Sequence, residues 1–172
     1  MREGSDAVKE QAAAALWSLS SDNKANKDTI TKLGGIEQLI ALTASGTTEK
    51  SLEQATGALA SLSSRHYENR ELIAKQLVAR MSNRGALAQT PGGAERVLSA
   101  VSKMCNGSAT NQAAIARAGG VPPLIQWLSG GGCSSGDAGA KDAGAQAAAA
   151  HALLSMVAGN EQLQVCTLGL QL

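Results

Sequence analysis

The residues with the greatest capacity for chemistry stand together in Ser21-Asp22-Asn23-Lys24. This segment contains both a Ser-x-x-Lys and a Ser-Asp-Asn pattern, which acyl-transfer enzymes with a serine nucleophile carry as two separate elements. Here both patterns fall on the same residues, so they cannot approach a substrate from two sides. A Ser or Asp at such a junction ordinarily caps the next helix. No nucleophile–base pair is signalled elsewhere, and we expect that the chain is not an enzyme.

Patterns for binding metals and cofactors are equally weak. Three cysteines never stand in Cys-x-x-Cys spacing, and two histidines add the only imidazoles: Cys105, Cys133, Cys166, His66 and His151. These five residues form no plausible zinc cluster. The run at 130–132 does not complete a Gly-x-Gly-x-x-Gly pattern, because position 135 is serine. We therefore expect no metal and no cofactor.

Charge and hydropathy exclude further classes of function. The chain has 15 basic and 14 acidic side chains, for a net charge of +1, which argues against general attraction to nucleic acid. No run of 18 apolar residues is present, so no membrane span is expected. The segment 1–6 lacks the apolar region of a secretory signal. Together with thiols expected to be reduced, this favours an intracellular protein, cytoplasmic, nuclear or both.

The chain repeats itself with a period in the low forties. Residues 10–20, Glu-Gln-Ala-Ala-Ala-Ala-Leu-Trp-Ser-Leu-Ser, return 43 residues later at 53–63 as Glu-Gln-Ala-Thr-Gly-Ala-Leu-Ala-Ser-Leu-Ser. A third copy fills 95–105, and a fourth, at 149–157, follows a Gly/Ser-rich insertion at 129–144. Such a period is typical of stacked helical repeats, in which each unit buries its apolar face against its neighbours.

A second landmark follows the first three blocks at a fixed distance. An Asn-x-x-x-Ile pattern recurs at 26–30, 69–73 and 111–115. Two of its copies are followed by a glycine pair, Gly34-Gly35 and Gly119-Gly120. The third repeat carries Leu77-Val78 there, so its corner must differ. We expect the glycines to form tight turns between helices, and Pro122-Pro123 to open a helix.

Residue spacing within the blocks predicts helices with one apolar face. Leucine, valine and methionine pairs stand three apart, at 16 and 19, 59 and 62, 101 and 104, and 153 and 156. Alanines at 12, 15, 55, 58, 100, 149 and 152 let helices approach closely. Cys105 takes the place of Ser20 and Ser63 and is expected to be a small packed residue.

The order Asn-x-x-x-Ile, Ala-Gly-Gly-Val-Pro-Pro-Leu-Ile and Glu-Gln-Ala-x-x-Ala-Leu-x-x-Leu-Ser resembles the armadillo repeat. This resemblance covers about residues 6–165 and implies an all-α, right-handed α-solenoid of three-helix repeats, H1, H2 and H3. Residues 1–172 then form a single domain. Its parts are a last helix only (6–21), three repeats (22–64, 65–107, and 108–158 with the insertion at 129–144), and the start of a further repeat or a tail (159–172).

In that family the H3 helices line a concave groove that takes extended peptides, so the resemblance implies a protein-interaction scaffold. The groove positions expected here are Glu10, Ala14, Ser18, Glu53, Gly57, Ser61, Arg96, Ser99, Lys103, His151 and Ser155. Small residues predict a shallow first half, and Arg96, Lys103 and His151 a more basic second half. Of these, Lys103 matches the groove lysines that β-catenin-like members use against acidic ligands. Glu10, Glu53 and Glu95 align as an acidic column.

Two alternative functions stay open. Importin-α members carry a Trp and an Asn in the groove, but the matching positions here hold neither, which disfavours a nuclear-transport adaptor. A structural subunit would instead pack through its outer H1 and H2 faces. The chain starts and stops inside repeat units, so we expect a piece of a longer array. Uncovered end residues then favour self-association, which light scattering tests: Leu16, Trp17 and Leu19 at one end, Leu163, Val165, Leu168 and Leu170 at the other.

Two further loops are expected at equivalent corners. The first is the insertion at 129–144, rich in Gly and Ser and with little to bury; Ser129, Ser134 and Ser135 are its candidate phosphoacceptors. The second spans Ser82 to Gly93 in the third repeat.

Overall fold

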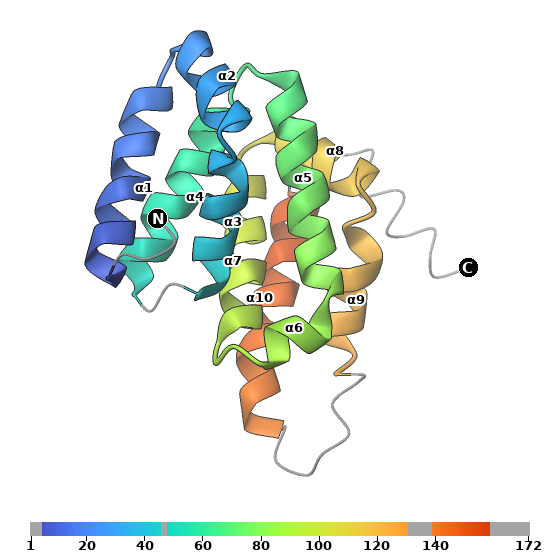
Figure 1. The fold of residues 1–172 in the computed structure, drawn as a ribbon. Coiled ribbons are helices and arrows are strands. Elements are labelled where there is room, and N and C mark those ends of the chain that lie inside the picture. The colour runs from blue at the N-terminus through green and yellow to red at the C-terminus, as the bar shows by residue number, and fades with distance from the viewer. Residues whose placement is uncertain (1–4, 46–47, 131–138, 159–172) are drawn as a thin grey trace.

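The computed structural model describes residues 5–45, 48–130 and 139–158, and all its regular elements are helices (Figure 1). In chain order they are α1 (Asp6–Ser20), α2 (Lys24–Lys32), α3 (Gly35–Ser45), α4 (Glu49–Ser63), α5 (Tyr67–Ser82), α6 (Arg84–Ala88), α7 (Gly93–Cys105), α8 (Ala109–Arg117), α9 (Val121–Leu128) and α10 (Gly139–Val157). The prediction of an all-helical chain is confirmed for the described residues. None of these helices combines the length and apolarity that crossing a membrane requires.

The repeated asparagines stabilise equivalent helix junctions. Asn26 Nδ2 donates to the Leu19 carbonyl at 2.8 Å, Asn69 to Leu62 at 3.3 Å, and Asn111 to Met104 at 2.9 Å. Each amide thus satisfies a carbonyl at the C-terminal end of the preceding helix, which has no partner within that helix. The N-caps of α2, α5 and α8 also recur, as Asn23, His66 and Ser108, and each accepts from the backbone N–H of the asparagine three residues later.

The glycine pairs form two tight corners, as predicted. Gly34 and Gly119 have φ of 75° and 83°, the left-handed region that favours glycine. The glycine that follows, Gly35 or Gly120, packs directly on the isoleucine of the preceding helix. Helix α5 lacks this corner and runs unbroken past Leu77 and Val78, which are buried. A bulky pair at the corner position therefore fuses two helices into one.

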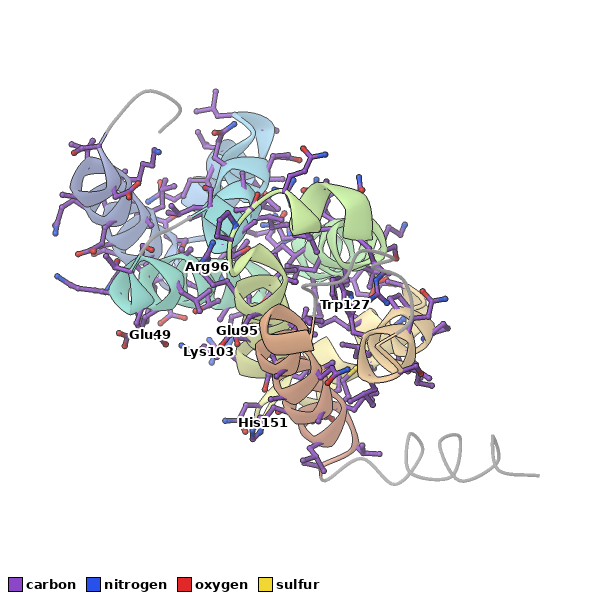
Figure 2. All side chains as sticks on the ribbon, turned by 90° about the horizontal axis from the view of Figure 1, so that it is seen from below. Glu49, Glu95, Arg96, Lys103, Trp127 and His151 are labelled. Carbon is purple, nitrogen blue, oxygen red and sulfur yellow. The ribbon has the colours of Figure 1, made fainter. Side chains whose placement is uncertain are left out.

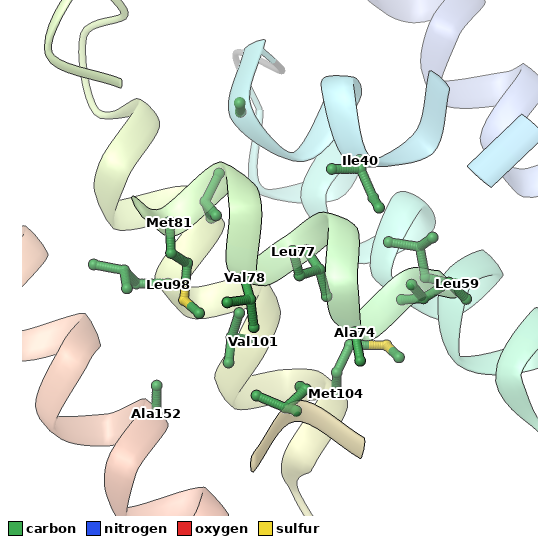
Figure 3. Close-up of a cluster of buried hydrophobic side chains, with 14 of the residues drawn as sticks. Ile40, Leu59, Ala74, Leu77, Val78, Met81, Leu98, Val101, Met104 and Ala152 are labelled. Carbon is green, nitrogen blue, oxygen red and sulfur yellow. The ribbon is translucent and has the colours of Figure 1, made fainter. Parts of the chain in front are cut away.

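The helices form two layers. In Figure 1, α1, α4, α7 and α10 follow one another across the molecule, and each contacts the next. The remaining six helices lie on one side of this row. The core between the layers is aliphatic, and Figure 3 shows Leu77, Val78 and Met81 of α5 facing Leu98, Val101 and Met104 of α7. Residues far apart in sequence thus share one continuous core.

A second column of side chains joins the layers. Lys27 Nζ donates to the Ser64 carbonyl at 2.6 Å, and Arg70 Nη2 donates to the Ser63 carbonyl at 3.3 Å. Gln112 Nε2 lies close to the carbonyl oxygens of three residues: Cys105 at 3.2 Å, Ser155 at 2.8 Å and Ala158 at 3.1 Å. Each donor directly follows a repeated asparagine and satisfies carbonyls at the end of α4, α7 or α10. Burial lowers the pKa of Lys27, since the charged ammonium is partly removed from water.

Both predicted loops contain helix. The segment Ser82 to Gly93 holds α6, whose N-cap Asn83 accepts from the Ala86 N–H at 3.2 Å. Arg84 lies 4.0 Å over the Trp127 ring and donates to the Gln126 carbonyl at 2.8 Å, which attaches this segment to α9. Residues 139–144 of the predicted insertion belong to α10. The prediction of a loop was therefore wrong for 84–88 and 139–144; Ser134 and Ser135 lie outside the described residues.

Cys105 is fully buried, which confirms the expectation of a small packed residue. Burial raises the pKa of its thiol to about 12, because the thiolate would lose its hydration. We expect iodoacetamide to alkylate Cys105 on the order of a thousandfold more slowly near pH 8 than in the urea-unfolded chain. Mass spectrometry of the peptides separates this residue from Cys133 and Cys166. Equal rates in the native and unfolded chains would contradict its burial.

Candidate functional site

The predicted groove residues lie on the four helices of one layer. Figure 2 shows Glu49, Glu95, Lys103 and His151 along one side of α4, α7 and α10, whereas Trp127 points into the space between the layers. We call the exposed side of α1, α4, α7 and α10 the inner face. The predicted residues come from all four of these helices: Glu10, Ala14 and Ser18 from α1, Glu53, Gly57 and Ser61 from α4, Arg96, Ser99 and Lys103 from α7, and His151 and Ser155 from α10. Four of them, Ser18, Glu53, Lys103 and His151, are exposed. The Arg96 side chain instead turns toward α3 of the other layer.

An indole packs between α1 and α4. A Cβ built on Gly57 would lie 2.5 Å from Trp17 Cζ3, so the ring rests directly on this glycine. Trp17 remains 38% exposed. Ser20 Oγ donates to Ser61 Oγ at 2.8 Å and closes the upper end of the same interface. The absence of a side chain at Gly57 therefore makes room for the Trp17 ring. The residue spacing within one helix did not indicate this contact between two helices.

Ion pairs tie neighbouring helices together across the inner face. Lys50 Nζ lies 2.9 Å from Glu10 Oε1 and links α4 to α1. The hydrogen bond with Glu10 raises the pKa of Lys50. Lys103 Nζ donates to Glu49 Oε1 at 2.7 Å and links α7 to α4. Both pairs are accessible to water, so each contributes little to stability, and their main effect is to neutralise two lysines.

The second ion pair shows that α7 is displaced along its axis relative to α4. In the sequence repeat Lys103 matches Ser61, yet it contacts Glu49, which lies 12 residues before Ser61. In a helix, 12 residues correspond to about 18 Å of rise, more than the two side chains span. Figure 1 also shows α7 lower than α4. The inner face is therefore stepped between α4 and α7.

The guanidinium of Arg96 donates its hydrogen bonds to backbone carbonyls. Its Nη2 donates to the Ala44 carbonyl at 2.7 Å and to the Pro91 carbonyl at 2.9 Å, and its Nε donates to Ala44 at 3.2 Å. Ala44 lies in the last turn of α3, where carbonyls lack helical partners and a cation is favourable. The side chain joins α7 to α3 and adds no free cation to the second half of the inner face.

Helices α7 and α10 pack through small polar contacts. Ser102 Oγ and Ser155 Oγ are 2.9 Å apart, and His151 is exposed. A Cβ on Gly144 would lie 2.6 Å from Glu95 Oε2, so the Glu95 carboxylate rests on the backbone of α10. Sequence reasoning did not single out Gly144 or Ser102. The recurrence of serines near the ends of the repeated blocks was a signal for Ser102, and the sequence held none for Gly144.

The end helices expose apolar side chains. On α1, Val8 and Leu19 are 56% and 55% exposed, and on α10 Leu154 is 66% exposed. The uncovered state of Trp17 and Leu19 is as predicted, whereas residues 163–170 lie outside the described part. Self-association through these ends stays a prediction.

Among the residues that the structure describes, no three His, Cys, Asp or Glu side chains are placed to hold a metal ion. Comparisons of the chain with models of known protein families, with curated proteins and with solved structures found no match.

Proposed function

We propose that this chain is an armadillo-type interaction module whose inner face binds an extended segment of a partner protein. The observation that carries the proposal is the recurrence of one junction: an asparagine amide on the end of the preceding helix, at 26, 69 and 111. Equivalent junctions at this spacing support an array of like units, and arrays of this kind present long continuous surfaces.

The dimensions of the inner face favour an extended ligand. Packed helices lie about 8–10 Å apart, so an extended segment rising about 3.3 Å per residue advances roughly three residues per helix. Polar side chains recur at similar positions on each helix, as Ser18, Ser61 and Ser155 do. Such a ladder can contact the backbone of a peptide at regular intervals. The step between α4 and α7 would divide the ligand into two contact regions.

Selection from a library of displayed random peptides tests the proposal. We expect the chain to enrich peptides that lose binding to a Ser18→Tyr/Ser99→Tyr variant, because two phenol rings would block both halves of the inner face. The matched control is Ala25→Tyr/Ala79→Tyr, which places the same rings at exposed positions of α2 and α5. Circular dichroism verifies that both variants keep their helicity.

The two double variants separate the inner face from the outer helices. Loss of binding in both, or in the control alone, would assign recognition to the outer helices and overturn the proposal. A library that yields no enriched peptide would overturn it as well. The absence of any enriched peptide would favour a subunit that packs through its outer faces.

A further inference from the structure

We propose that the partner segment is basic and places cationic side chains against Glu53 and Glu95. This inference rests on the proposed function and adds the chemistry of the ligand. Pairing decides which charges of the inner face are available to a ligand, since a count of acidic and basic residues alone gives a nearly neutral surface.

The described basic side chains of α1, α4 and α7 are already engaged. Lys9 pairs with Asp6 at 3.7 Å, Lys50 with Glu10, and Lys103 with Glu49. The remaining cation, Arg96, donates to backbone carbonyls of α3 and of the turn before α7. None of the four described cations on α1, α4 and α7 is therefore free to receive an acidic ligand.

Two carboxylates are left over. Within the described residues, Glu53 and Glu95 form no ion pair and accept no side-chain hydrogen bond, and both are exposed. Lys50, whose ammonium pairs with Glu10, is also near Glu53, and the carboxylate of Glu53 helps to raise the pKa of Lys50. One ammonium thus serves two carboxylates. Glu53 and Glu95 occupy matching positions on α4 and α7, on either side of the step in the inner face. On α1, α4 and α7 the carboxylates thus outnumber the cations available to them, and this excess of negative charge complements a basic ligand.

The outer layer has the opposite charge. Its six helices carry eight basic side chains (Lys24, Lys27, Lys32, Arg70, Lys75, Arg80, Arg84, Arg117) and four acidic ones (Asp28, Glu37, Glu68, Glu71). Counted in the same way, with paired side chains included, α1, α4 and α7 carry four basic side chains (Lys9, Lys50, Arg96, Lys103) and five acidic ones (Asp6, Glu10, Glu49, Glu53, Glu95). The net charge of +1 for the whole chain conceals this difference between the layers. A basic segment is repelled by the outer layer and is directed to the inner face.

An aromatic surface adjoins the first carboxylate. Glu53 lies one helical turn before Gly57, on which the partly exposed Trp17 ring rests. An ammonium or guanidinium placed here would contact the face of an indole and lie near a carboxylate. Cation–π attraction adds to the ion pair at such a position. We therefore expect the first cationic residue of the ligand to lie between Trp17 and Glu53.

The same peptide selection tests this inference through composition. Peptides enriched by the unmodified chain should contain more Lys and Arg and less Asp and Glu than the starting library. A synthetic peptide from the enriched pool is then measured by fluorescence anisotropy. We expect Glu53→Lys/Glu95→Lys to weaken its binding at least about tenfold, through two lost pairs and two new repulsions. Added salt should weaken binding to the unmodified chain.

The control reverses two carboxylates on the outer layer, as Glu37→Lys/Glu68→Lys, and has the same net charge. Its affinity should stay within about twofold, since additional positive charge on that layer acts only over a distance. Enriched peptides that depend on Ser18 and Ser99 but are neutral or acidic would overturn this inference and leave the proposed function standing. Equal losses in both charge variants would overturn it too, because bulk charge would explain the effect.

Discussion

Replacing Gly35 with alanine is expected to destabilise the fold by about 2–3 kcal/mol, because the corner between α2 and α3 has no space for a methyl group. A Cβ here would lie 2.5 Å from Ile30 Cγ2 and 2.9 Å from the Ile30 carbonyl oxygen. That oxygen belongs to the backbone of α2, so it cannot move aside unless the corner opens. Urea unfolding followed by circular dichroism measures the loss.

Two further glycines supply the controls. Gly85→Ala changes an exposed residue of α6 with nothing within 4 Å of the added Cβ, and should stabilise by about 0.5 kcal/mol, since alanine favours helix. Gly120→Ala should reproduce the loss, because Ile115 Cγ2 and the Ile115 carbonyl lie 2.6 and 2.9 Å from its Cβ. A Gly35→Ala protein as stable as the Gly85→Ala protein would refute the close approach.

The glycine corners were predictable because they are local. The N-caps were not: Asn23 caps α2, and not the expected Ser21 or Asp22, and His66 caps α5. An asparagine seven residues after a helical leucine, or an isoleucine five residues before a glycine, involves one helix and the next. Because the sequence repeats, the same local pattern occurs at several junctions. This is why α1 begins at Asp6 and α10 ends at Val157 as the sequence indicated.

Contacts between units were less predictable. The indole of Trp17 rests on Gly57, and Arg96 reaches Ala44, a residue 52 positions away. Neither partner follows from a period measured along one helix, because each depends on how two units are placed in space. The displacement of α7 is of the same kind. Helix α5 is continuous where other units turn, so the unit that contains α7 has a different shape from its neighbours.

The sequence accordingly predicted which helices form the inner face, but it did not predict which charges on that face are available to a ligand. Sequence alignment placed Lys103 and Arg96 in one half and suggested a more basic surface there. Their cations are engaged by Glu49 and by the Ala44 carbonyl. A charged side chain presents a field to a ligand only where nothing nearby compensates it, and that property requires three-dimensional neighbours.

Replacing Gln112 with glutamate is expected to destabilise the fold by about 3 kcal/mol near neutral pH. Gln112 is 1% exposed, and its Nε2 is the donor for the carbonyls of Cys105, Ser155 and Ala158. A carboxylate would place negative charge against three carbonyl oxygens. The C-terminal ends of α7 and α10, where these carbonyls lie, disfavour negative charge further.

The pH dependence identifies the cause. Burial and the carbonyls favour the protonated acid, so the introduced carboxyl would have a pKa in the folded chain above its unfolded value of about 4.3. The folded state then binds more protons than the unfolded state between these two pKa values. Stability relative to the parent chain is therefore greatest below about pH 4 and is lost as the pH rises through the folded pKa.

Gln112→Lys is the matched control, because the equivalent position in the earlier unit is Lys27, whose Nζ donates to the Ser64 carbonyl. A lysine keeps a donor toward the same oxygens and should lose less stability than the glutamate, with no loss between about pH 4 and neutral pH. Urea unfolding of both variants across this range separates the explanations. Equal, pH-independent losses would show that packing volume, and not the hydrogen bonds of Gln112, joins α8 to the ends of α7 and α10.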